Sequence, residues 1–150
     1  MNTLDELDKT IIKELTVMEK KSLRQIARRL GIPASTLHDR IKKLEKKGVI
    51  KGYTVVIDEK ILGYSIRALI LINVDGKHIL EVEKEIAKDP HVQLVLDITG
   101  EFDIAVIVLF KNIDQLDNFV KKLLKNPYIK QTRTSIAFRT IKFNPNPPTT

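Results

Sequence analysis

Apolar residues in the first fifty positions recur three and four apart, the spacing that lines one face of a helix. Three such stripes follow one another, over residues 4–15, 23–30 and 37–44. The predicted inward-facing residues are Leu4, Leu7, Ile11, Ile12 and Leu15, then Leu23, Ile26, Ala27 and Leu30, then Leu37, Ile41 and Leu44. The pattern predicts a unit of three short helices that ends at Gly48.

Gly31 and Pro33 separate the second predicted helix from the third. A glycine can end a helix in the left-handed conformation, and a proline blocks continuation while suiting the start of the next helix. Small residues at Ala27 and Gly31 would let the two helices approach closely, as a helix-turn-helix requires. The outward face of the third helix carries donors and cations, which is typical of an element that reads DNA.

The charge of the chain is concentrated in this part. Residues 1–52 carry 13 Lys and Arg against 7 Asp and Glu, and the remaining residues carry 13 against 12. Nearly all of the net charge of +7 therefore lies on the first third of the chain. Such a basic field attracts phosphate backbones through counterion release, so it favours DNA binding over an ordinary helical domain with a solvated lysine face.

The candidate DNA-binding residues divide by the part of DNA that they would contact. Phosphate contacts are expected from Arg24, Gln25 and Arg28 on the second helix and from Lys42 and Lys43 on the third. Base contacts are expected from the front of the third helix, at Ser35, Thr36, His38 and Arg40. Arg40 has a second interpretation, because it could instead pair with Asp39 or with an acidic residue of the first helix.

Beyond the helical unit the periodicity changes, and several segments show the two-residue alternation of strands. Residues 51–64 are predicted to be a strand linker, and residues 65–143 a second domain, before a flexible, Pro-rich tail at 144–150. In the second domain the predicted order is strand 66–75, helix 79–90, strands 91–98 and 103–110, a helix after Asn112, and strand 132–143. This βαββαβ order is that of a ferredoxin-like sandwich, so the predicted fold class is α+β.

Two helices cover only one face of such a sheet, yet both faces are apolar. The expected residues of the uncovered face are Leu69, Leu71, Val95, Ala105, Ile107 and Leu109. Because a soluble monomer rarely exposes so large an apolar patch, the pattern predicts a homodimer formed through the sheets. A two-fold dimer would also present two reading helices to successive turns of the major groove.

Several motifs in this order resemble the Lrp/AsnC family of "feast/famine" transcription regulators, over nearly the whole chain. They are LDxxDxxII at residues 4–12, IARRLGI, STLHDRIKKLEKKGVI, ITGEFD and TSIAFRTIK. One departure is Pro33-Ala34, where family members often carry a serine that caps the reading helix. The resemblance implies a winged helix-turn-helix followed by a ferredoxin-like domain of the RAM type.

The resemblance also implies regulation by a small effector, usually an amino acid, bound between dimers that assemble further, often into octamers. The residues that match the effector-binding hairpin and last strand are Gly100, Glu101, Asp103, Thr132, Thr134 and Ile136. A carboxylate such as Asp103 can pair with an ammonium group, and threonine hydroxyls can hold a carboxylate. The same residues also have a purely structural interpretation, because glycine and aspartate are common in turns and threonine is common in strands.

Composition narrows the alternatives. The chain has no cysteine, no Gly-rich phosphate loop and three histidines in separate segments, so no metal, cofactor or enzymatic activity is expected. No apolar run is long enough to span a membrane, and a cytoplasmic, nucleoid-associated protein is expected. Two alternatives stay open: an architectural, chromatin-like DNA-binding protein, and a subunit resembling sirohaem decarboxylase, which shares the family's fold.

Overall fold

The computed structural model describes residues 4–17 and 20–148. They form two units. Residues 58–141 make up a sheet unit, and residues up to 57 make up a helical unit, with which residues 142–148 group. The division thus falls inside the predicted linker, and the predicted free tail groups with the helices.

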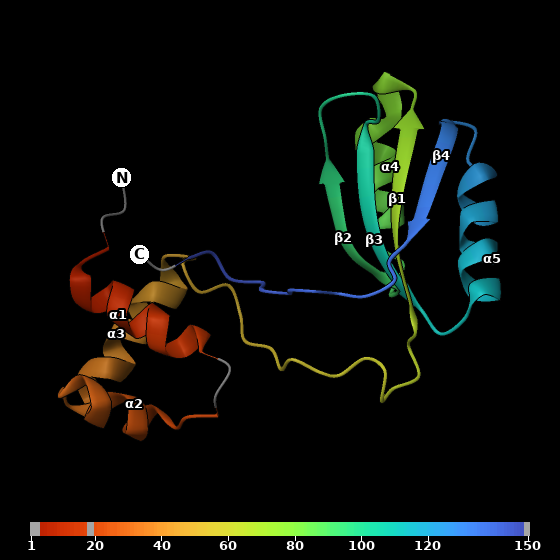
Figure 1. Cartoon of the computed structure of the whole chain (residues 1–150). Coiled ribbons are helices and arrows are strands. Elements are labelled where there is room, and N and C mark those ends of the chain that lie inside the picture. The colour runs from red at the N-terminus through yellow and green to blue at the C-terminus, as the bar shows by residue number, and fades with distance from the viewer. Residues whose placement is uncertain (1–3, 18–19, 149–150) are drawn as a thin grey trace. The chain divides into compact units, whose positions relative to one another are not determined.

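The helical unit contains the three predicted helices (Figure 1). They are α1 (Glu6–Thr16), α2 (Leu23–Leu30) and α3 (Ala34–Lys46). Their shared core consists of Ile11, Ile26, Ala27, Leu37, Ile41 and Leu44. The prediction for Leu23 was wrong, because this first residue of α2 is 41% exposed and the buried stripe begins only at Ile26.

The start of each helix shows how its bounds are set. Asp5 caps α1 in a capping box with Asp8, and Ser22 caps α2 in the same way with Gln25. α2 ends at Gly31, whose φ of 66° is the left-handed conformation that the sequence predicted. α3 begins after Pro33, which is its N-cap residue, and no side chain caps the helix there, in contrast to family members with a serine at this place.

The sheet unit has the predicted βαββαβ order, with a short 3₁₀ turn, η1 (Gly76–His78), before the first of its helices. Its elements are β1 (Ile66–Val74), α4 (Ile79–Ile86), β2 (Val92–Asp97), β3 (Ile104–Phe110), α5 (Ile113–Leu124) and β4 (Ile129–Ile136). All neighbouring strands are antiparallel, in the order β2-β3-β1-β4. This confirms the predicted ferredoxin-like fold and the α+β class.

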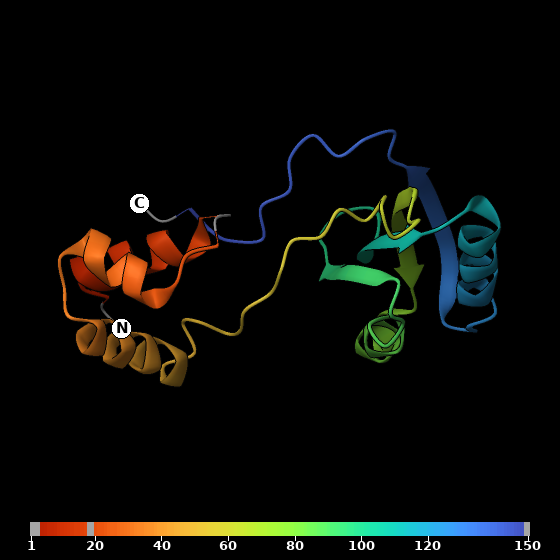
Figure 2. The same cartoon turned by 90° about the horizontal axis from the view of Figure 1, so that it is seen from below.

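Both helices pack on one face of the sheet, which Figure 2 shows with α4 seen end-on. Even-numbered residues of β1, such as Ile70 and Ile72, are fully buried under these helices. The odd-numbered Leu69 and Leu71 lie on the open face, as predicted.

Val95 does not lie on the open face, which corrects the prediction for β2. It pairs with the inward-facing Val106 and packs against the core, since directly paired residues share a face. A bulge between Val92 and Leu94 shifts the register, so that Leu94 and Leu96 face outward instead, 45% and 46% exposed.

Two extended segments also differ from the prediction. Residues 51–57 were predicted to be a strand, but no strand forms there, and none of their backbone amides donates a hydrogen bond within the described chain. A strand needs a neighbour to pair with, and the described part of this single chain supplies none. For the same reason β4 ends at Ile136 rather than at residue 143.

Candidate DNA interface and ligand site

The exposed face of α3 presents the predicted DNA-binding side chains together. Because Leu37, Ile41 and Leu44 are buried, the opposite side of the helix is exposed to solvent. Ser35, His38, Lys42 and Lys43 are exposed on α3, and Thr36 is half-buried. Ser35 is in the first turn, where a reading helix contacts base edges, and the lysines follow one or two turns later.

Arg40 takes the second of the two roles that the sequence left open. Its guanidinium binds the carboxylates of Asp5 and Asp8, and the distance to Asp8 Oδ1 is 3.0 Å. The hydrogen bond that Arg40 donates to Asp5 lowers the pKa of the Asp5 carboxyl. Arg40 therefore holds α3 against the start of α1, and its guanidinium is engaged by these two carboxylates rather than free for a base.

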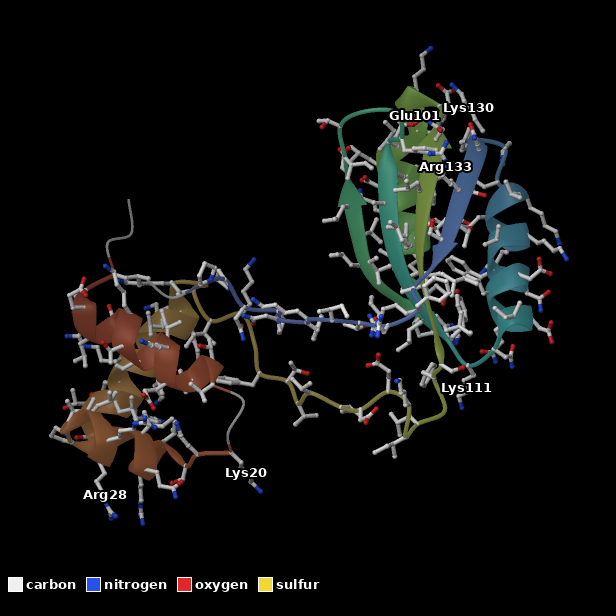
Figure 3. The ribbon with its side chains drawn as sticks, viewed as in Figure 1. Lys20, Arg28, Glu101, Lys111, Lys130 and Arg133 are labelled. Atoms are coloured by element: carbon white, nitrogen blue, oxygen red, sulfur yellow. The ribbon has the colours of Figure 1, made fainter. Side chains whose placement is uncertain are left out.

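The predicted phosphate contacts on α2 lie in different surroundings. The side-chain oxygen of Gln25 accepts a 2.8 Å hydrogen bond from the Ser22 amide, so it is engaged in the cap of the helix. Arg24 and Arg28, one turn apart, are exposed, and Figure 3 shows Arg28 pointing away from the helices. Neither forms an ion pair within the described residues. Both guanidinium groups are thus available to phosphates.

The predicted effector hairpin between β2 and β3 is fastened to the end of β1. The amide of Asp103 donates to the Ile72 carbonyl at 3.0 Å, and Asp103 Oδ2 accepts a 2.8 Å hydrogen bond from the Val74 amide. Asn73 Nδ2 donates to the Glu101 carbonyl at 2.6 Å. One oxygen of Asp103 is therefore engaged by the backbone, and the other accepts no hydrogen bond within the described residues.

Gly100 gives this hairpin its shape. Its φ of 115° lies in a region that favours glycine, so the turn requires this residue. The side chain of Glu101 is 71% exposed beside the turn, 3.4 Å from the guanidinium of Arg133. Figure 3 shows Glu101 and Arg133 close together at one end of the sheet.

Arg133 is a residue of this site that the sequence reasoning missed. Its guanidinium lies 4.8 Å from the ring centroid of the buried Phe102, a cation–π arrangement. It alternates along β4 with the three predicted ligand residues, so it faces the other side of the sheet. A cation next to the threonine motif was visible in the sequence, but only the register places it beside the hairpin.

The predicted residues of β4 do not all lie near the hairpin. Thr132 is opposite Ile72, two strand spacings or about 10 Å from the end of β3. Thr134 and Ile136 lie two and four residues further along the strand, opposite Ile70 and Ala68. The described single chain thus does not bring the six predicted effector residues into one pocket.

The described residues were also compared with what a metal site and a membrane-spanning helix require. Within the described residues, no group of three or more His, Asp and Glu side chains could hold a metal ion. No helix in the part of the chain that the structure describes is long and apolar enough to cross a membrane.

Two family models match the chain. The model of the Lrp/AsnC ligand binding domain matches residues 67–147, and that of a winged helix-turn-helix DNA-binding domain matches residues 4–51. The chain belongs to the Lrp/AsnC family. It is a transcriptional regulator with a DNA-binding helix-turn-helix and an Lrp/AsnC ligand-binding domain, as the motifs predicted.

Related proteins match nearly the whole chain. An uncharacterized HTH-type transcriptional regulator of Pyrococcus furiosus is 41% identical over 139 residues, which cover 93% of this chain and 94% of the relative. The HTH-type transcriptional regulator FL11 of Pyrococcus horikoshii is also 41% identical over 139 residues, covering 93% and 92%.

A solved structure with the same fold contains a ligand. The crystal structure of a transcriptional regulator from Neisseria meningitidis in complex with L-Met has a TM-score of 0.90 and 23% identity, covering 97% of both chains. At this identity the comparison shows the fold.

The Asp5–Arg40 pair predicts how the stability of the helical unit depends on pH. Because the pKa of Asp5 is lowered in the folded protein, its charge stabilises the fold above the ordinary aspartate pKa of about 4. That stabilisation is lost as pH falls through the lowered pKa. Asp5→Asn, which keeps a good capping side chain, should lower the Tm at pH 7, and the difference from wild type should shrink between about pH 5 and pH 2.

The control for this measurement is Glu6→Gln, which removes an exposed carboxylate of the same turn that does not contact Arg40. Its Tm should follow that of the wild type at every pH. A difference between Asp5→Asn and wild type that stays constant down to pH 2 would contradict the assignment.

Proposed function

We propose that this regulator binds specific DNA sequences as a homodimer, with one α3 helix in each of two successive major grooves. The observation that carries the proposal is the division of α3 into a buried apolar side and an exposed side with donors in front and lysines behind. Donors near the start of the helix can reach base edges, and cations further along can bind phosphates. Its place of action would be the nucleoid.

The proposal assigns different effects to two exposed residues one turn apart on α3. On a duplex selected by the wild-type protein from random DNA, His38→Ala should cost about 1–3 kcal/mol, because a base contact is lost. On a scrambled duplex the same change should have little effect. Lys42→Ala should weaken binding to both duplexes equally and reduce the slope of log K against log salt by about one, because a phosphate contact is lost.

Both affinities can be measured by fluorescence anisotropy at several salt concentrations. An equal loss for His38→Ala on the selected and the scrambled duplex would show that His38 does not read bases. If the wild type binds all duplexes alike and coats them evenly, the protein is an architectural DNA-binding protein instead.

The dimer is proposed to form through the open face of the sheet. This face exposes Leu69, Leu94 and Leu96, which are 37%, 45% and 46% exposed, and no helix of the sheet unit covers it. Burying such a face against a second copy removes apolar surface from water. Higher assembly, to an octamer, would follow from contacts between dimers, as the family resemblance implies.

Leu69→Lys should therefore shift the protein from dimer toward monomer in sedimentation velocity, because a buried lysine is costly at an apolar interface. The matched control is Leu80→Lys on α4, which is 67% exposed on the helix-covered side. Its sedimentation coefficient should remain that of the wild type. Equal effects of the two lysines, or none from Leu69→Lys, would place the interface elsewhere.

The effector is proposed to be an amino acid that modulates assembly and operator affinity, bound at the hairpin of Gly100, Glu101 and Asp103. The family model for this domain is that of a ligand-binding domain, and a regulator of the same fold forms a complex with L-Met. The hairpin offers a free carboxylate oxygen of Asp103 and the Glu101–Arg133 pair, which suit an ammonium and a carboxylate group. Thr132, Thr134 and Ile136 would complete the pocket across an interface between dimers.

Isothermal titration calorimetry with each of the twenty amino acids tests this site. Asp103→Asn keeps an oxygen that accepts from the Val74 amide but loses the charge. It should therefore weaken the binding of the amino acid by about 1.5–3 kcal/mol. Asp97→Asn, an exposed change just before the hairpin, should leave the affinity unchanged. If no amino acid binds the wild type, the protein does not sense amino acids, and the DNA-binding proposal stands alone.

A further inference from the structure

One largely buried cation of the sheet unit belongs to neither of the two sites. Arg67 lies at the start of β1, and its side chain is only 20% exposed. Its Nη2 donates to Glu59 Oε1 at 2.7 Å, and its Nη1 donates to Gln93 Oε1 at 2.5 Å. The planar guanidinium therefore connects the segment that enters the sheet with the strand β2.

An apolar side chain would fit this position of β1 at a lower cost in free energy than an arginine. Leu69 and Leu71 are the next residues of β1 on the same face. Arg67 Nε is buried and has no hydrogen-bond partner within the described chain, which costs free energy. Gln93 is at the bulge of β2, and a bulge re-aims a side chain. Arg67 is thus kept in this position despite the free energy lost at its unpaired Nε, and Gln93 is turned toward it. This indicates that the contacts of Arg67 have a role of their own.

The segment that Arg67 holds is the last part of the linker. Residues 58–65 form a turn bonded to the sheet: the Tyr64 amide donates to the Glu59 carbonyl at 3.0 Å, and Ser65 donates to the Phe110 and Lys111 carbonyls at 3.1 and 2.8 Å. Figure 3 shows Lys111 at this end of the sheet, opposite the end with Glu101. The preceding residues 51–57 form no backbone hydrogen bond within the described chain, but the Tyr53 hydroxyl donates to Glu45 Oε1 of α3 at 2.8 Å. The boundary between the two units lies after Ile57.

Arg67 also contacts the segment that leaves the sheet unit. Its carbonyl accepts a 2.9 Å hydrogen bond from the amide of Ala137, the first residue after β4. One residue thus fastens both connections of the sheet unit, the linker through its side chain and the C-terminal segment through its backbone.

We propose that Arg67, through Glu59, is a positioning residue for DNA binding, because it fixes the point at which the linker leaves the sheet unit. Residues 54–57, between the Tyr53–Glu45 hydrogen bond and this contact, then act as the tether, with a reach of about 11 Å if they behave as a flexible chain. Releasing residues 58–63 would extend that reach to about 17 Å. In the dimer of the proposed function, on which this inference rests, a longer tether lets the two helical units accept a wider range of half-site spacings.

Glu59→Ala is the variant that tests the proposal, because Glu59 is 35% exposed and lies in a turn outside the sheet core. Lys60→Ala, an exposed change in the same turn, is the matched control. Glu59→Gln, which keeps the size of the side chain but removes the charge paired with Arg67, serves as a second variant. Each full-length protein is titrated against duplexes built from a site that the wild type selects from random DNA, with the two half-sites moved apart or together by one to five base pairs, and against a single half-site.

Wild type and Lys60→Ala should share one sharp spacing optimum. In Glu59→Ala, the ratio of affinities between the best and the worst spacing should fall about fivefold or more, while the affinity for a single half-site changes less than about twofold. Hydrogen exchange should show faster exchange of the amides of residues 58–65, with the protection of β1 and β3 retained. A contact that only stabilises the sheet would lower the Tm without changing the spacing profile.

An unchanged spacing profile in Glu59→Ala, with the turn released in hydrogen exchange, would overturn the inference and leave the proposed dimer intact. If Glu59→Ala loses the protection of the sheet, Glu59→Gln is judged by the same criteria. A wild type that selects no site with two half-sites would instead overturn the proposed function, and this inference with it.

Discussion

Strand β1 forms contacts on both of its edges and on one of its faces, and the rest of the sheet unit depends on them. Its backbone pairs with β3 on one edge and with β4 on the other, and its even-numbered side chains pack under α4 and α5. The odd-numbered side chains are then forced onto the open face, because successive residues of a strand alternate. The place of Arg67, the exposure of Leu69 on the open face and the hydrogen bond from Val74 to the hairpin between β2 and β3 all depend on this one register.

Helix α3 of the helical unit likewise has one buried side and one exposed side. α3 presents one side to the core through Leu37, Ile41 and Leu44, and its Arg40 is held by Asp5 and Asp8 of the α1 start. These contacts fix how the helix is rotated. The donors and lysines on the remaining side therefore face outward together, as the proposed contact of α3 with DNA requires.

Much of this fold could be predicted from the sequence, because buried stripes are local patterns. The predictions were wrong where a residue's environment depends on a segment that is distant in the sequence. The bulge in β2 turned Val95 inward, and residues 51–57 had no strand to pair with in the described chain. Among the DNA-binding candidates, Arg40 was ambiguous because its acidic partners lie more than thirty residues away. The effector residues of β4 could be named only from family resemblance, and Arg133 was missed because register alone brings it to Glu101.

The central claim is that two α3 helices of a dimer read two DNA half-sites. The most direct measurement is a selection of bound duplexes from random DNA by the purified protein, followed by sequencing. We expect an enriched inverted repeat whose half-site centres lie about 10–10.5 base pairs apart or a multiple of that distance. Sequences enriched without a repeat, or no enrichment above the starting pool, would contradict it.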